Sequence, residues 1–239
     1  MDGVGIGKND ATNAVYMAKT PVLDRLMASR LYTQLRAHGP AVGLPSEDDM
    51  GNSEVGHNAL GAGRVFEQGA KLVNSAIETG KIYESDTWKA VMAKGSGSAN
   101  GSEGGTVHFI GLLSDGNVHS HIKHLFALIE KSAALGIKKV RIHPLLDGRD
   151  VGEKSALSYI KPLEELLAKI SSERSFDYRI ASGGGRMNVT MDRYNADWNI
   201  VKKGWEAHVL GIGRKFASAS KAVQSFYNED PKMTDQYMD

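Results

Sequence analysis

The chain has 239 residues, of which 41% are hydrophobic and 24% are charged, and it contains no cysteine. The apolar content excludes an intrinsically disordered chain, and the absence of cysteine excludes a disulfide-stapled scaffold. Lys and Arg number 29 against 28 for Asp and Glu, so the formal net charge of +1 gives no electrostatic reason to expect a nucleic-acid or membrane partner.

No apolar run approaches the ~20 residues of a membrane-spanning helix, and no apolar signal stretch follows Met1. We therefore expect a soluble, cytoplasmic chain. Separately, we expect a monomer.

The region before Phe66 is rich in glycine and predicts loops, with one helix over Thr20–Ala28 that has Pro21 in its first turn. The Gly- and Ser-rich stretch Lys94–Thr106 predicts a flexible surface loop. We place a domain boundary near Gln68–Lys71.

After that boundary, short β-branched runs alternate with amphipathic stretches, a pattern that predicts an α/β fold with a parallel sheet. The expected strands are Thr106–Leu113, Lys139–His143 and Tyr178–Ala181, and the expected helices are His121–Leu135, Ser155–Ile170 and a helix through Trp198, Val201 and Trp205.

Polar residues follow each expected strand. Because the carboxyl ends of parallel strands meet at one edge of a sheet, we expect these side chains to gather there. They are Asp115, His119, Arg149, Asp150, Arg186 and Arg193. A guanidinium group can grip a phosphate or a carboxylate through two parallel hydrogen bonds, so two or three arginines at one edge suit a small, doubly anionic ligand. The alternative is that Arg149, Asp150 and Asp147 form only a surface ion pair.

Two further patterns have ordinary structural interpretations. His119, His121 and His124 lack the spacing and the completing ligands of a zinc site, so we interpret His119 as a ligand-binding imidazole and the other two as helix-surface residues. Ser53, within Gly51–His57, fits a helix N-cap and lacks the G-x-S-x-G pattern of a hydrolase elbow.

Read together, the motifs DGVG, MGNSEVGH, LSDGNVHS, DGRD and GR…MDR occur in an order that resembles the cofactor-independent (2,3-bisphosphoglycerate-independent) phosphoglycerate mutases, in the version found in plants and trypanosomatids. The resemblance runs from Asp2 to Tyr237. It implies an α/β fold related to alkaline phosphatase, with residues 1–67 forming the N-terminal part of a metal and nucleophile domain. Residues 68–239 would form an inserted phosphoglycerate-binding domain with a parallel sheet.

The resemblance also implies an activity: interconversion of 3-phosphoglycerate and 2-phosphoglycerate through a phosphoserine. Ser53 matches the nucleophile and, with Asp2, a metal ligand. The residues that match the substrate-binding set are His119, Arg149, Asp150, Arg186 and Arg193. Two divalent ions are implied, Mn²⁺ first and Mg²⁺ or Co²⁺ as alternatives, with no requirement for 2,3-bisphosphoglycerate.

The family's remaining metal ligands have no match in these 239 residues, so we expect this chain to be inactive by itself as an N-terminal fragment of a mutase. Two other functions stay open. One is a metal-dependent phosphatase of the same superfamily, against which the arginine cluster argues. The other is a non-catalytic module that binds small phosphorylated acids.

Overall fold

The computed structural model describes residues 5–97, 104–190 and 197–239. The chain divides into two compact units, Met1–Lys71 and Leu72–Asp239. Each unit is described by itself.

The first unit is built from short helices joined by long loops. They are α1 (Ala14–Met17), α2 (Pro21–Met27), the 3-10 helix η1 (Gly39–Val42) and α3 (Ser53–Ala62). Its buried hydrophobic cluster consists of Val42, Leu44 and Val55. Buried Gln68 ties this cluster together, because its side-chain amide donates to the carbonyl oxygens of Val42 and Val55 at 3.0 and 3.2 Å.

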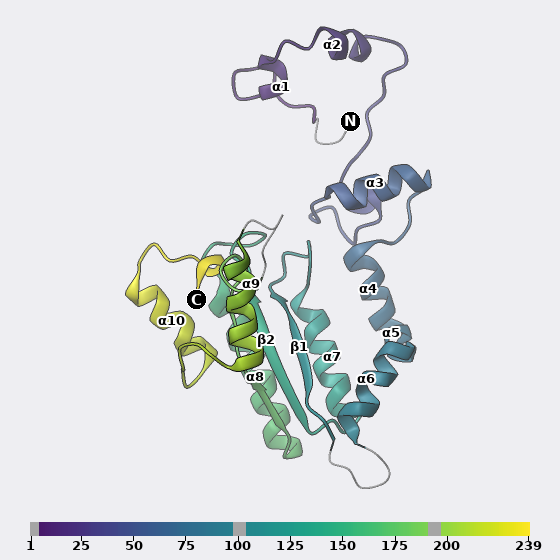
Figure 1. Ribbon diagram of the computed structural model, residues 1–239. Helices are drawn as coiled ribbons and strands as arrows, with labels where there is room; N and C mark the ends of the chain where they lie inside the picture. The colour runs from purple at the N-terminus through teal and green to yellow at the C-terminus, as the bar shows by residue number, and fades with distance from the viewer. Residues whose placement is uncertain (1–4, 98–103, 191–196) are drawn as a thin grey trace. The chain divides into compact units, whose positions relative to one another are not determined.

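The second unit is organised around a parallel sheet (Figure 1). Its strands are β1 (Val107–Leu113), β2 (Lys139–Leu146), β3 (Asp177–Ile180) and β4 (Gly184–Gly185). β2 pairs with β1 from Val140 to Leu146, and on its other side it pairs first with β3 and then with β4. This arrangement confirms the predicted α/β class and parallel sheet.

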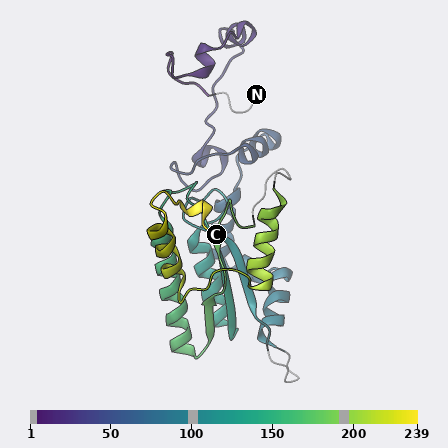
Figure 2. The same ribbon diagram turned by 60° about the vertical axis from the view of Figure 1, so that its left-hand side comes forward.

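Alongside the sheet, the second unit contains helices that pack on the sheet or on one another (Figures 1 and 2). They are α4 (Gly69–Glu78), α5 (Lys81–Glu84), α6 (Asp86–Ser96), α7 (Ile122–Ala134), α8 (Ala156–Arg174), α9 (Trp198–Trp205), the π-helix η2 (Glu206–Leu210), α10 (Ala219–Glu229) and the 3-10 helix η3 (Asp235–Tyr237). The main core lies between one face of the sheet and α7 and α8. Val140 and Ile142 of β2 meet Ile129 of α7 and Ile160 and Leu163 of α8 there, all at most 1% exposed.

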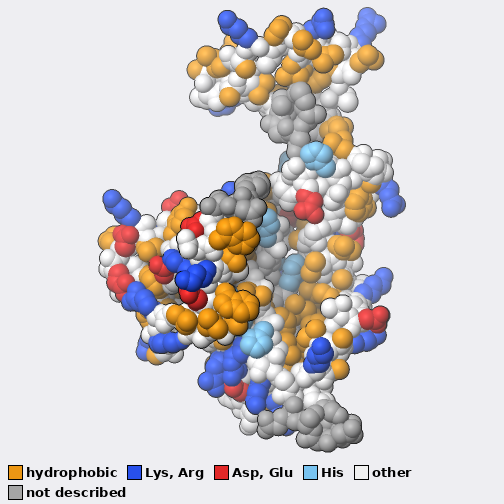
Figure 3. Space-filling model, in the orientation of Figure 1, with side chains coloured by type: hydrophobic (Ala, Val, Ile, Leu, Met, Phe, Trp, Pro, Cys, Tyr) orange, Lys and Arg blue, Asp and Glu red, His pale blue; other side chains and the backbone are white. Residues whose placement is uncertain are grey.

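α9 presents apolar side chains to solvent. Trp198, Val201 and Trp205 all lie on this helix and are exposed, and Figure 3 shows hydrophobic side chains gathered over it. Among the described residues, no helix combines the length and apolar character that a membrane crossing needs.

β2 is longer than expected, because it continues through Pro144 to Leu146. A proline cannot donate to a sheet ladder, so it normally disfavours an interior strand position. The carbonyl oxygens of Ile142 and Leu146 both point toward β3 and β4. Because the backbone polar groups of every second residue point to the same side of a strand, the nitrogen of Pro144 also points toward β3 and β4. β3 ends opposite Ile142, so no β3 residue lies beside Pro144. The missing N–H of Pro144 therefore costs no hydrogen bond to β3.

Candidate functional site

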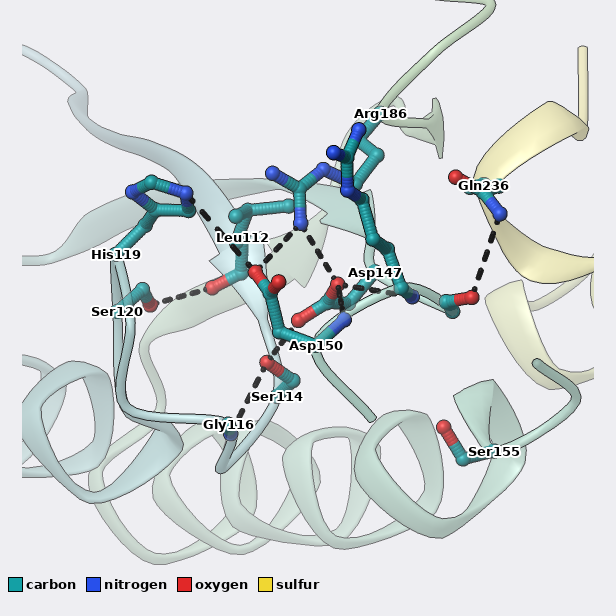
Figure 4. A network of polar contacts seen from close by, with 12 residues as sticks. Leu112, Ser114, Gly116, His119, Ser120, Asp147, Asp150, Ser155, Arg186 and Gln236 are labelled. Atoms are coloured by element: carbon teal, nitrogen blue, oxygen red, sulfur yellow. Dashed lines mark hydrogen bonds and ion pairs between the residues drawn. The ribbon is translucent and has the colours of Figure 1, made fainter. Parts of the chain in front are cut away.

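Three loops that follow strands meet in one polar network, shown in Figure 4. The loop after β1 contributes Ser114 and His119, the loop after β2 contributes Asp147 and Asp150, and the turn after β4 contributes Arg186. One guanidinium nitrogen of Arg186, Nη1, donates to Asp147 Oδ1 and to Asp150 Oδ2, both at 2.8 Å. His119 Nε2 lies 4.0 Å from the same Asp150 oxygen. We call Asp147, Asp150 and Arg186 the carboxylate–arginine cluster.

Asp147 organises the loop that carries it. The residue is 3% exposed, and its side chain accepts hydrogen bonds from Ser114 Oγ at 2.6 Å and from the backbone amides of Arg149 and Asp150 at 3.2 and 3.0 Å. Burial by itself would raise the pKa of this carboxyl, but the hydrogen bonds from Ser114, the Asp150 amide and Arg186 hold the pKa below its ordinary value. The loop is therefore folded around a buried, ionised carboxylate.

Arg186 is also buried, at 5% exposed. Burial opposes its charge, while the contacts to Asp150 and Asp147 raise its pKa above the ordinary value. Its Nε atom is buried and has no hydrogen-bond partner in the described part of the chain. A buried N–H without a partner is costly, so this donor is suited to an acceptor that enters the cluster from outside.

Arg149 differs from Arg186. It is exposed, and within residues 104–190 and the other described ranges its side chain makes no hydrogen bond or ion pair. The expected surface ion pair at this loop is thus replaced by a buried one, in which Arg186 takes the place of Arg149.

Ser53 is the first residue of α3, and the N-cap is Asn52, whose side chain accepts from the Val55 amide at 2.9 Å. The N-cap interpretation of Ser53 is therefore off by one residue. His57 Nδ1 lies 2.8 Å from the Ser53 carbonyl oxygen and 3.1 Å from Ser53 Oγ. A carbonyl oxygen only accepts, so Nδ1 carries the proton and is not oriented here to remove one from the hydroxyl.

A second polar network crosses the face of the sheet opposite the main core. His108 Nδ1 lies 2.9 Å from His143 Nε2, and His143 Nδ1 lies 2.6 Å from Ser182 Oγ. Ser182 Oγ lies 2.7 Å from His208 Nδ1, whose Nε2 lies 2.9 Å from Thr190 Oγ1. We call this the histidine network. It links β1, β2, the segment after β3 and η2.

His143 and His208, two members of the histidine network, are neutral at pH 7. Burial, with contributions from His208 and His108, lowers the pKa of His143 to about 4, and burial also lowers the pKa of His208. Each link then needs a single proton, which neutral imidazoles and hydroxyls supply.

The structure places the predicted site residues as follows. His119, Asp150 and Arg186 come together, and Arg149 follows in the same loop. Asp115 instead accepts from Tyr159 Oη of α8 at 2.6 Å. Asp2 and Arg193 lie outside the described residues. Of the two histidines assigned to a helix surface, His121 caps α7 and His124 reaches Asn74 Oδ1 at 2.5 Å.

The described residues contain no group of three or more His, Cys, Asp or Glu side chains that could hold a metal ion. Ser53 is the described member of the expected metal set, and its hydroxyl faces His57. The residues that the structure describes therefore do not by themselves form a metal cage.

Parallel strands with polar loops gathered at their carboxyl ends define an α/β protein of the class in which ligands bind at that edge of the sheet. Residues 73–239 match the family described as BPG-independent PGAM N-terminus (iPGM_N). The chain belongs to this family.

Curated relatives carry the same family name. A protein of Leptospira interrogans, named as a probable 2,3-bisphosphoglycerate-independent phosphoglycerate mutase, is 51% identical over 240 residues, covering 100% of this chain and 43% of its own length. The enzyme of Trypanosoma brucei brucei is 51% identical over 99% of this chain and 42% of its own. That of Ricinus communis is 48% identical over 100% of this chain and 42% of its own.

A solved structure is also similar. The phosphoglycerate mutase of Leishmania mexicana, described at low cobalt concentration, matches with a TM-score of 0.85 and 51% identity over 100% of this chain and 42% of that one. The resemblance drawn from the sequence motifs is thereby confirmed. The chain spans less than half the length of these relatives.

Proposed function

We propose that this chain is the nucleophile-bearing and phosphoglycerate-binding part of a 2,3-bisphosphoglycerate-independent phosphoglycerate mutase, which interconverts 3-phosphoglycerate and 2-phosphoglycerate. The observation that carries the proposal is the carboxylate–arginine cluster: a buried guanidinium with an unpartnered Nε, beside His119, at the carboxyl ends of parallel strands. The family to which the chain belongs supports the same substrate.

The two arginines would divide the binding of the substrate. Arg186 is fixed by two carboxylates and offers its remaining donors in one orientation, which favours a planar carboxylate or a phosphate oxygen. Arg149 is exposed and unpaired within the described residues, so it can swing toward the ligand. His119 would add a further donor, and Arg193 would complete the set.

Ser53 would accept the phosphoryl group and return it to the other hydroxyl of the same glycerate. A serine hydroxyl is a weak nucleophile and needs a base or a metal ion to favour the alkoxide. In the described geometry His57 donates toward Ser53, so the activation must come from elsewhere.

We propose two divalent ions, Mn²⁺ in preference to Mg²⁺ or Co²⁺, with Asp2 and Ser53 among their ligands. Two such ions supply Lewis-acid stabilisation of a transferring phosphoryl group. Since the described residues lack a cluster of three ligands, further ligands would have to join Ser53.

Titration of the 239-residue chain with 3-phosphoglycerate in a calorimeter tests the binding half of the proposal. We expect weak binding that falls at least 10-fold in Arg149→Ala, because the exposed side chain can be removed without unfolding the site. Lys139→Ala, an exposed cation at the opposite end of β2, is the matched control and should bind as the parent does. Equal affinity in all three proteins would contradict the proposal.

The catalytic half is tested with an enolase-coupled assay in the presence of Mn²⁺. We expect no turnover above background from this chain alone, because its described residues do not form a metal cage. In a longer mutase that contains this sequence, Ser53→Ala should abolish turnover. Activity retained in that variant would exclude the phosphoserine route.

A further inference from the structure

Asp235 is a fully buried carboxylate that the proposed function does not use. It is 0% exposed and lies in η3. Its Oδ2 atom accepts from the backbone amides of Ser155 and Ala156, both at 2.8 Å, at the start of α8, and Tyr227 Oη of α10 donates to its other oxygen. Burial raises the pKa of Asp235. Burying a carboxylate costs free energy unless hydrogen-bond donors satisfy it, and three donors do so here.

Asp235 and its neighbours touch the loop after β2. The Asp235 amide donates to the Glu153 carbonyl at 2.8 Å, and Gln236 Nε2 approaches the Gly148 carbonyl at 3.4 Å, a contact visible in Figure 4. Gly148 has a φ of +59°, and a Cβ built there would lie 2.8 Å from Asp235 Cβ. A side chain at position 148 would therefore force the contact with Asp235 to shift.

The same segment touches the turn that carries Arg186. The Gly185 amide donates to the Met238 carbonyl and the Met187 amide donates to the Gln236 carbonyl, both at 2.8 Å. A Cβ at Gly185 would lie 2.4 Å from the Gln236 carbonyl. We call residues 235–238 the 235–238 segment. Its carbonyl oxygens accept hydrogen bonds from both residues that flank Arg186 along the chain.

We propose that Asp235 is a positioning residue for phosphoglycerate binding: by anchoring the 235–238 segment to the start of α8, it sets the distance between the Asp147–Asp150 loop and Arg186. This inference rests on the proposed function for its ligand. The placement itself rests on contacts within the second unit alone.

Asparagine is a close structural substitute at this position. Its Oδ1 can accept from both amides of α8, and its Nδ2 can donate to Tyr227 Oη, which reverses that one bond. Asp235→Asn should therefore rescue what Asp235→Ala loses. Tyr227→Phe removes one of the three donors and should give an intermediate result.

The test measures two quantities in the 239-residue chain: affinity for 3-phosphoglycerate, and hydrogen exchange of the Asp150 and Arg186 amides. Neither amide bonds to Asp235; the first donates to Asp147 Oδ1 and the second to the Leu146 carbonyl. The control is Ile170→Ala, a buried residue of α8 14 positions beyond Ala156, roughly 20 Å along the helix, which weakens the core without touching the loop.

We expect Asp235→Ala to weaken binding at least 10-fold and to speed exchange at Asp150 and Arg186 at least 10-fold more than Ile170→Ala does at equal overall stability. Asp235→Asn should stay within about threefold of the parent in both measurements. In an Arg149→Ala background, Asp235→Ala should reduce the affinity for 3-phosphoglycerate by a smaller factor than it does in the parent. The reason is that both substitutions weaken the contact between the Asp147–Asp150 loop and the ligand.

If Asp235→Ala and Ile170→Ala behave alike at matched stability, Asp235 is merely structural and the inference is overturned. If the parent chain binds no 3-phosphoglycerate while Asp235→Ala still speeds exchange at both amides, the proposed function fails and the positioning of the two loops stands.

Discussion

The carboxylate–arginine cluster and the histidine network both bury a titratable side chain of β2 or of the loop directly after it. They differ in whether that side chain is charged. Asp147, at the end of β2, stays ionised because Arg186 and several hydrogen-bond donors surround it. His143, four residues earlier, stays neutral because burial lowers its pKa to about 4. Buried charge needs a partner of opposite sign, whereas a buried base can simply release its proton.

The largest expected effect comes from removing the carboxylate of the charged network. Asp147→Ala leaves Ser114 and two backbone amides without their acceptor and leaves Arg186 with Asp150 alone. We expect a loss of about 3 kcal/mol in the free energy of unfolding, measured with urea. Asp147→Asn keeps acceptor oxygen and should lose less. A loss under about 1 kcal/mol in Asp147→Ala would show that the cluster adds little stability.

Acid should separate the two networks by pH. The folded pKa of His143 lies near 4, below its ordinary value of 6.5, so the stability it contributes is complete above 6.5 and is lost as the pH falls toward 4. Between pH 7 and pH 5 we expect titration of His143 to lower the free energy of unfolding by about 2 kcal/mol. Asp147, whose folded pKa is also lowered, contributes stability above its unfolded value of 3.8 and loses it only at lower pH.

Urea titrations at pH 7, 6 and 5 measure this first window. His143→Gln should be less stable than the parent at pH 7 but should show a smaller decrease between pH 7 and pH 5. Parallel curves for the two proteins would mean that His143 is not the group that titrates.

A smaller effect is expected from the middle of the histidine network. Ser182→Ala removes the hydroxyl that joins His143 to His208. Buried His143 and partly buried His208 then each lose a partner, and we expect a loss of about 1–2 kcal/mol at pH 7. Thermal unfolding measures it. Ser172→Ala, whose exposed hydroxyl bonds only its own helix, is the control and should be nearly unchanged.

The smallest effect on stability is expected at Arg149, which belongs to neither network. Arg149→Ala should change the free energy of unfolding by no more than about 0.5 kcal/mol, as exposed substitutions usually do. Its effect on 3-phosphoglycerate binding should nevertheless be clear. A large loss of stability would mean that the side chain supports the loop rather than the ligand.

The sequence pattern predicts much of this fold. The helices over Thr20–Ala28 and His121–Leu135 appear as Pro21–Met27 and Ile122–Ala134, because proline, glycine and apolar spacing mark them locally. The three main strands also appear, although β2 runs three residues past its expected end. Its extension depends on where β3 stops, which no local pattern records.

The site is predicted less completely. Loop position after parallel strands indicates that His119, Asp150 and Arg186 meet, and they do. It does not indicate that Asp147 is buried and that Arg186, rather than Arg149, is its partner. The role of Asp235 could not be predicted. It accepts a hydrogen bond from the amide of Ser155, which lies 80 residues earlier, and sequence spacing does not relate residues that far apart. The histidine network likewise joins residues that lie far apart along the chain.

Thr190, the last member of the histidine network, has a φ of +85°, a conformation that is rare for a β-branched residue. Glycine would adopt it without the steric cost of about 1–2 kcal/mol. The hydroxyl of Thr190 meets His208, and its amide donates to the Ile200 carbonyl at 3.0 Å. Thr190→Gly would therefore relieve the backbone strain and keep the amide bond to Ile200, but it would remove the hydroxyl that meets His208.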